Sequence, residues 1–179
     1  METVEFKKYI EILPELLQSD NRTVLVTSDK IYVLNGVENS LNFDYCEQNN
    51  IEILQTRHFG GTIVNFKDDI CVGNYQKRFN DFGEKFTDAL NNFFISKGLN
   101  SCIEGNDILV DGYKVASSMS TNVNGTLYTA FHITVNCDLE LIKKVCTKPM
   151  VKVPKALTDF GITKQEIIDF IQKESRNDY

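Results

Sequence analysis

The stretch NDILVDGYKVAS, residues 106–117, predicts a tight β-hairpin. Asp111-Gly112 is a strong signal for a two-residue turn, because both positions of such a turn need residues that tolerate a positive φ. The two arms would carry Asn106 and Lys114, eight positions apart, so that both side chains could meet one ligand. A lysine placed there can act as a compact cation on a phosphoryl or acyl oxygen. The alternative interpretation is a surface hairpin with a solvated Lys114.

Further turn signals extend this hairpin into an antiparallel meander. Gly105-Asn106 and Asn124-Gly125 separate strands expected over residues 101–104, 107–110, 113–123 and 126–135. Upstream, phenylalanines and leucines three and four positions apart predict a long amphipathic helix over residues 79–97, ended by Gly98. Two more helices are expected over residues 138–146 and 163–174, the second opening with a Thr163–Glu166 capping box.

The first half of the chain predicts a mixture of helices and short strands. Residues 4–17 have helical spacing but contain Pro14, which should kink or divide the helix. A hairpin is expected between residues 23–27 and 30–34, then a turn at Asn35-Gly36, a helix over residues 40–49 and a strand over residues 51–54. A second hairpin is expected between residues 62–66 and 70–75. Strands in runs, rather than in strict alternation with helices, favour an α+β domain with mostly antiparallel sheet and flanking helices.

Composition and charge narrow the class of protein. The chain has 179 residues, 42% of them hydrophobic, which suits one domain with a sizeable core and argues against disorder. Its 19 basic and 25 acidic side chains give a net charge of -6, which argues against nucleic-acid binding driven by bulk positive charge. The sequence has no signal-peptide pattern and no apolar run long enough to span a membrane.

Five cysteines are scattered without a CxxC pair, at positions 46, 71, 102, 137 and 146. An odd, unpatterned set suits free thiols in a reducing compartment better than a disulfide framework. We therefore expect a cytoplasmic protein.

The loop Arg57-His58-Phe59-Gly60-Gly61-Thr62 is a candidate anion site. Paired glycines let backbone N–H groups come close to a phosphate or carboxylate, and Arg57 adds a cation. An ordinary Gly-Gly turn with an exposed arginine is the simpler alternative, since short glycine motifs often occur without a ligand.

These motifs together resemble the catalytic domain of lipoate–protein ligases, within the biotin and lipoate ligase superfamily. The family has, in order, an Arg-x-x-Gly-Gly loop, an Asn-Asp-Leu/Ile motif, a Lys followed by small residues, and Asn-x-Asp-Leu. The corresponding segments here are residues 57–61, 106–108, 114–118 and 136–139, and the likeness spans about residues 31–171.

The resemblance implies a class II synthetase-like fold and a two-step reaction. ATP would adenylate lipoate or octanoate, and a lysine of an acceptor lipoyl domain would then attack the mixed anhydride. Lys114 would contact the acyl-adenylate, and Asn106 would help bind the nucleotide phosphate or its Mg²⁺. The residues expected to line the substrate and nucleotide pocket are Arg57, His58, Gly60, Gly61, Thr62, Asn106, Asp107 and Ser117.

The chain departs from the family pattern at several positions. Thr62, Ser117 and Phe131 stand where the family usually has glycine, so the pocket could be narrower. The family's His-His-Gly-Thr is replaced by residues 129–132, of which only His132 is a histidine. We expect His132 to be an ordinary strand residue and His58 to line the pocket. No cluster in the sequence predicts a protein-bound metal.

Two other functions stay open. Related octanoyltransferases hold the acyl group as a thioester on a cysteine paired with the same lysine, and Cys146, eight residues after Asp138, is the candidate nucleophile here. Most such cysteines are buried and inert. The other alternative is a non-catalytic relic that binds an acyl or adenylate ligand, or a protein.

The expected partners follow from the charge pattern and the length. Residues 141–155 contain five lysines and no acid, although the chain as a whole is acidic. Because acceptor lipoyl domains are typically acidic, this stretch could steer docking; a solvated basic face is the alternative. Residues 1–179 have room for one catalytic domain and no C-terminal accessory domain, which a separate chain could supply.

Overall fold

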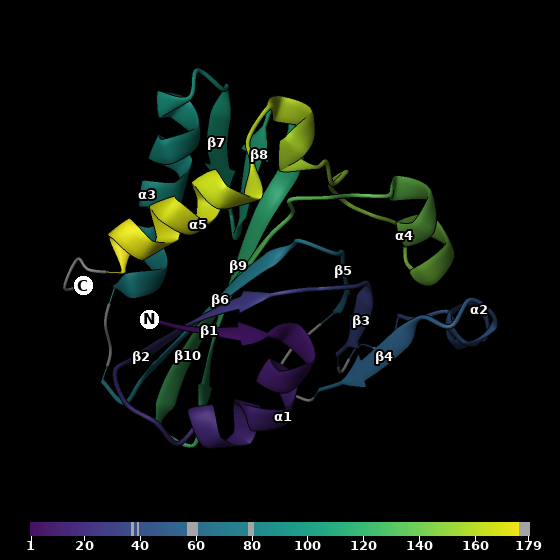
Figure 1. Cartoon of the computed structure of the whole chain (residues 1–179), viewed down its shortest axis with the longest axis horizontal. Coiled ribbons are helices and arrows are strands. Elements are labelled where there is room, and N and C mark those ends of the chain that lie inside the picture. Colours follow the sequence, from purple (N-terminus) through teal and green to yellow (C-terminus); the bar gives the residue numbers. More distant parts are fainter. Residues whose placement is uncertain (37, 39, 57–60, 79–80, 176–179) are drawn as a thin grey trace.

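The computed structural model describes residues 1–36, 38, 40–56, 61–78 and 81–175, and Figure 1 shows a large sheet beside a small one, with helices around both. The large sheet has seven strands in the order β1-β2-β6-β10-β9-β8-β7, and the small sheet has three in the order β4-β3-β5. The strands are β1 (Glu2–Glu5), β2 (Arg22–Thr27), β3 (Tyr32–Asn35), β4 (Glu52–Gln55), β5 (Thr62–Asn65), β6 (Ile70–Gln76), β7 (Ser101–Glu104), β8 (Asp107–Val110), β9 (Tyr113–Val123) and β10 (Thr126–Ile133). The helices are α1 (Phe6–Leu16), α2 (Phe43–Gln48), α3 (Phe82–Ser96), α4 (Leu139–Val145), the 3-10 helix η1 (Leu157–Phe160) and α5 (Lys164–Glu174).

The expected α+β class and the meander β7-β8-β9-β10 are confirmed. Each pair in the meander is antiparallel. The β8–β9 turn has positive φ at both central residues, 51° at Asp111 and 80° at Gly112, and the β9–β10 turn repeats this with 51° at Asn124 and 87° at Gly125. These are the dihedrals of a type I′ hairpin, whose twist matches that of the strands it joins.

Both hairpins expected in the first half of the chain are wrong. The strands β2 and β6 belong to the large sheet, whereas β3 and β5 belong to the small one, so each connection crosses from one sheet to the other. At the first crossing Ser28 is buried, and its hydroxyl accepts a hydrogen bond from the Asn65 side chain. At the second, the buried Asp69 carboxylate accepts from the Phe66 N–H. At the expected turn Asn35-Gly36 the described residues are still paired with β5: Asn35 ends β3 opposite Thr62, and the Gly36 N–H donates to the Gly61 carbonyl.

The N-terminal segment also differs from expectation. Residues 2–5 form β1, which pairs in parallel with β2; with an acid at each end and a single apolar residue, this strand has no alternating apolar pattern. The Glu5 side chain then caps α1 by accepting from the N–H groups of Lys7 and Lys8. Pro14 lies inside a single helix that ends at Leu16, so the proline neither divides the helix nor precedes a second one.

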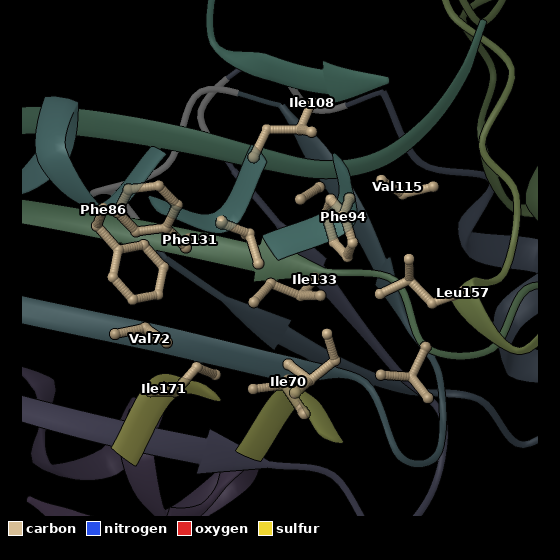
Figure 2. Close-up of a cluster of buried hydrophobic side chains, with 14 of the residues drawn as sticks. Ile70, Val72, Phe86, Phe94, Ile108, Val115, Phe131, Ile133, Leu157 and Ile171 are labelled. Atoms are coloured by element: carbon tan, nitrogen blue, oxygen red, sulfur yellow. The ribbon is translucent and has the colours of Figure 1, made fainter. Parts of the chain in front are cut away.

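The two faces of the large sheet pack against different helices. On β2, Leu25 joins a cluster with α3 and α5, whereas its neighbours Val24 and Val26 join a cluster with α1. This alternation follows from the two-residue period of a strand. Figure 2 shows the first cluster, in which Phe86 and Phe94 of α3 lie near Phe131 and Ile133 of β10, while Ile171 of α5 lies near Ile70 and Val72 of β6. A third cluster lies between the small sheet and helices α2 and α4.

The remaining helices match their predictions closely. The helix expected over residues 79–97 is α3, and Gly98 after it has φ of 79°. The expected capping box at the start of α5 is present, with Glu166 and Thr163 bonded to each other's backbone N–H. Within the described ranges, no helix is long and apolar enough to cross a membrane.

Gly73 on β6 is a position where packing requires glycine. A Cβ built there would lie 2.7 Å from the Tyr9 hydroxyl and 3.0 Å from the Tyr75 hydroxyl. We expect Gly73→Ala to lower the free energy of unfolding by about 1–3 kcal/mol, the usual cost of overpacking a core. Urea denaturation of the single variants and of Gly73→Ala/Tyr9→Phe is the measurement. Removing the Tyr9 hydroxyl relieves the closest contact, so the double variant should lose less than the sum of the singles; strict additivity would contradict this explanation.

Glu166 should make stability depend on pH at the acid end. The hydrogen bond from Lys97, then those from Thr163, lower the pKa of Glu166 from 4.5 to about 2. Because the folded pKa is the lower one, this stabilisation is complete above about pH 4.5 and is lost as the pH falls towards 2. Glu166→Gln keeps a capping side chain but removes the charge, so it should be less stable at pH 7 and equal to wild type near pH 2. Denaturant titrations at both pH values test this, and a Glu166→Gln variant as stable as wild type at pH 7 would contradict it.

Candidate active site

Lys114 and Asp107 form the ion pair at the centre of the candidate site. The Lys114 Nζ lies 2.8 Å from Asp107 Oδ1. The register of the β8–β9 hairpin shifts between Ile108 and Leu109, so that Ile108 faces Ala116 while Leu109 faces Lys114, which leaves Val115 as an extra residue. The hairpin expected from the sequence therefore forms, with a bulge beside its lysine.

Lys152 joins this pair from a distant part of the chain. Its Nζ lies 3.0 Å from Asp107 Oδ2 and 3.0 Å from Glu104 Oε2. The segment that carries Lys152 runs beside the start of β9, where the Lys114 N–H donates to the Val153 carbonyl and the Lys155 N–H donates to the Lys114 carbonyl. The sequence did not predict that Lys152 belongs to the site. The one feature that pointed to this residue was the lysine-rich, acid-free stretch of residues 141–155.

The two lysines control the ionisation of Asp107. Burial acts to raise the pKa of this carboxyl, but the hydrogen bonds and charges of Lys114 and Lys152 outweigh burial and hold its pKa below the usual range. The hydrogen bonds from Lys152 to Glu104 and Asp107 in turn raise the pKa of Lys152. Asp107 is therefore an ionised partner that fixes two cations side by side.

Two neighbouring cavities lie between the sheets. The first, here called the apolar cavity, has a volume of about 170 Å³ and is lined by Phe6, Tyr9, Leu34, Gly61, Ile63, Cys71, Ser117, Ser118, Met119, Tyr128, Ala130, Phe131 and His132. The second, here called the lysine cavity, has a volume of about 180 Å³ and is lined by Thr62, Ile63, Val64, Phe66, Lys114, Ser117, His132, Thr134, Ile142, Cys146, Met150, Lys152 and Pro154. Ile63, Ser117 and His132 line both cavities, so the two meet at these residues.

The expected pocket residues divide among several places. Gly61 and Ser117 line the apolar cavity, and Thr62, Ser117 and Lys114 line the lysine cavity. A Cβ built at Gly61 has no described atom within 4 Å, so the space beside this glycine is open. The Thr62 hydroxyl is held by Ser40 and by the Asn35 side chain. Arg57, His58 and Gly60 lie outside the described residues.

Asn106 is not brought to Lys114. Its carbonyl accepts from the Ser118 N–H at 2.7 Å, and the residue borders a different groove that is also lined by Glu84 and Asp88. Among the described residues there is no group of three or more His, Cys, Asp and Glu side chains that could hold a metal ion.

His132 occupies a more central position than an ordinary strand residue. It lies opposite Ser117 in the β9–β10 register and lines both cavities. Its Nε2 is 3.3 Å from Oδ2 of Asp69, a side chain with no exposed area. The Asp69 carboxylate also accepts hydrogen bonds from the N–H groups of Phe66, Val135 and Asn136, at 2.8–3.1 Å.

The cysteines near the cavities are held as thiols. Cys146 lines the lysine cavity, and burial, helped by nearby Cys46, raises its pKa. Cys71 lines the apolar cavity, and burial and the Asp69 charge raise its pKa well above the usual range. Because the thiolate is the nucleophile, neither environment activates its cysteine.

Intramolecular contacts engage most of the lysine-rich stretch. Lys143 pairs with Glu140, Lys148 with Glu38, and Lys152 with Asp107 and Glu104. Lys155 lies over the rings of Tyr113 and Phe160, at 4.8 Å and 4.6 Å from their centres. The surface formed by this stretch is therefore less positively charged than its count of lysines suggests.

Several solved structures share the fold of this chain. The chain matches a bi-partite lipoate protein ligase from Thermoplasma acidophilum with TM-score 0.78 and 15% identity, over 96% of this chain and 80% of that one. It matches P. falciparum LipL1 in complex with lipoate with TM-score 0.76 and 13% identity, over 95% of this chain and 57% of that one. It matches lipoate-protein ligase A bound with ATP with TM-score 0.76 and 15% identity, over 94% of this chain and 79% of that one. At these identities the likeness shows the fold, a lipoate and biotin ligase fold of class II synthetase type.

The sequence itself gives the family. No curated protein matches the chain. The model of the lipoyl protein ligase A/B catalytic domain, however, matches residues 11–171, most of the chain. This protein therefore belongs to the lipoyl protein ligase A/B catalytic domain family.

Proposed function

We propose that this protein is an ATP-dependent lipoate–protein or octanoate–protein ligase. The observation that carries the proposal is the junction of the apolar cavity with the lysine cavity at Ile63, Ser117 and His132. A fatty acid with an apolar chain and an anionic head needs these two environments side by side. The chain would lie in the apolar cavity, and its carboxylate would lie towards Lys114.

The first step would form the acyl-adenylate. A carboxylate oxygen attacks the α-phosphorus of ATP, the new P–O bond forms, and pyrophosphate leaves with the electrons of the broken P–O bond. Lys114 and Lys152 would stabilise the negative charge on the phosphate oxygens. A lysine ammonium has three N–H donors, and the contact of Lys114 with Asp107 occupies one of them. The others could hold the acyl and phosphate oxygens.

ATP and Mg²⁺ are proposed as a joint substrate. Mg²⁺ usually keeps several waters and binds through one or two carboxylates plus substrate phosphates. This mode of binding does not require a cluster of metal-ligating side chains, and none is present among the described residues. Asn106 would take part only where the phosphates extend to its groove.

The proposed acceptor is an acidic lipoyl domain. The T. acidophilum neighbour is a bi-partite ligase solved with its E2 lipoyl domain, which supports a lipoyl acceptor and a separate accessory chain here. Lys144 is exposed and follows Lys143 on α4. Because most lysines of residues 141–155 already make intramolecular contacts, the attraction of this stretch for an acidic partner should be modest and should weaken as the salt concentration rises.

Binding of a lipoyl-adenylate analogue tests the proposal directly. A ligand at 100 times its dissociation constant adds about 2.7 kcal/mol of stability. For a chain of this size that amounts to a rise in Tm of roughly 5–10 °C. We expect this rise with a non-hydrolysable lipoyl- or octanoyl-adenylate in differential scanning fluorimetry. No rise at saturating analogue would contradict a lipoate-related role.

Lys114→Ala tests the role of the central lysine. We expect lipoate- or octanoate-dependent ATP–pyrophosphate exchange in the wild type and a loss on the order of 10²–10³-fold in the variant, the usual effect of removing one charge-stabilising donor. Lys8→Ala, at an exposed ion pair on α1, is the matched control and should leave exchange unchanged. A folded Lys114→Ala variant with wild-type exchange would contradict the assignment.

A thioester route through Cys146 is the second candidate, because Cys146 and Lys114 line the same cavity. The raised pKa of Cys146 argues against it. We expect iodoacetamide at pH 7.5 to modify the exposed Cys102 well before Cys146, as read by peptide mass spectrometry. Rapid alkylation of Cys146, or an octanoyl thioester that Cys146→Ser abolishes, would favour the acyltransferase.

A further inference from the structure

We infer that His132, held by Asp69, is the general base that receives the proton of the attacking lysine in acyl transfer. This inference rests on the proposed ligase function and assigns the second step of that reaction. It follows from where His132 lies, from the partner that fixes its ring, and from what the other groups around it can do.

The position of His132 matches that of the reacting carbonyl. An acyl group whose chain fills the apolar cavity and whose phosphate lies by Lys114 has its carbonyl carbon where the two cavities meet. Three residues line both cavities: Ile63, Ser117 and His132. Ile63 has no titratable group and the Ser117 hydroxyl is a weak base at neutral pH, which leaves the imidazole.

Asp69 lies beside the ring and is itself fixed in place. Its carboxylate has no exposed area, and three backbone N–H groups fix it in place. The Nε2 atom of His132 is buried 3.3 Å from Asp69 Oδ2, and it has no well-aligned hydrogen-bond partner among the described residues. Long or poorly aligned contacts of this kind are common in ligand-free sites and tighten when substrate binds. With Nε2 as the protonated nitrogen facing Asp69, Nδ1 is the one that can take a proton.

The other ionisable groups at the junction are unsuited to the task. From β6, Cys71 lies opposite His132, and its raised pKa keeps it a thiol. From β9 and the segment beside it, Lys114 and Lys152 are cations paired with Asp107. Cys146, after α4, is likewise held as a thiol. His132 is the remaining side chain in this set that has a nitrogen able to accept a proton.

The step balances without any further reactant. The acceptor lysine enters as a neutral amine, having lost its ammonium proton to solvent. Its nitrogen forms a bond to the acyl carbon, and the bond from that carbon to the AMP oxygen breaks, with the electron pair leaving on AMP. The second proton lost from nitrogen goes to Nδ1 of His132, and the imidazolium then releases it to solvent. Asp69 stabilises the imidazolium and is a positioning residue.

Two small nucleophiles of different basicity test the assignment. After attack, the lysine nitrogen of Nα-acetyl-lysine amide must give up its second proton to a base, whereas the much less basic nitrogen of hydroxylamine loses that proton to water with little help. With the full chain and preformed lipoyl-adenylate, we expect His132→Gln to slow amide formation by about 10²-fold or more, the usual contribution of a general base. Formation of the hydroxamate should change by less than about 3-fold.

The ratio of the two rates separates chemistry from structure. Asp69→Asn is expected to destabilise the fold and lower both rates, yet the ratio of amide to hydroxamate formation should still fall. An equal loss for both nucleophiles, or no loss, in folded His132→Gln would overturn the inference while leaving the ligase function intact. A wild-type protein that neither binds nor consumes lipoyl-adenylate would overturn both, and the binding measurement would show it before any variant is compared.

Discussion

The buried Asp69 carboxylate is the interaction that sets the relation between the two sheets. It lies where the chain leaves the small sheet after β5 and enters the large sheet at β6, and it accepts hydrogen bonds from Phe66 on one side and from Val135 and Asn136 on the other. An unpaired carboxylate in such a place would cost several kcal/mol, so these donors must stay in position for the fold to form. The end of β5, the start of β6 and the end of β10 are thereby tied to one group.

The two cavities exist because of this arrangement. Their shared lining comes from β5 through Ile63 and from the large sheet through Ser117 and His132. Had β5 and β6 formed a hairpin in one sheet, no space would remain between them for a ligand. The apolar cavity further depends on α1, whose Phe6 and Tyr9 close one side. The crossing from β5 to β6, which local sequence patterns do not predict, therefore creates the candidate site.

Local sequence patterns predicted the second half of the chain well and the first half poorly. The meander follows from turns such as Asp111-Gly112, where neighbouring residues alone decide the conformation. The connections at Ser28 and Asp69 carry similar turn residues, but their strands pair with partners far away in the sequence. Periodicity identifies a strand without saying which sheet it joins. The decisive contacts, Ser28 with Asn65 and Asp69 with Val135, are long-range and leave no local pattern.

The site shows the same division. Lys114 and Asp107 could be found because both lie on one hairpin, whereas Lys152 and His132 reach the site through tertiary packing. Burial and neighbouring charges then set the protonation state of the groups in the site. Burial raises the pKa of Cys146 and Cys71 and so keeps the thiols protonated, while Lys114 and Lys152 keep Asp107 ionised nearby. A site built this way is better suited to stabilising anionic phosphate and acyl oxygens than to storing an acyl group on sulfur, which is the physical reason for preferring an adenylate to a thioester.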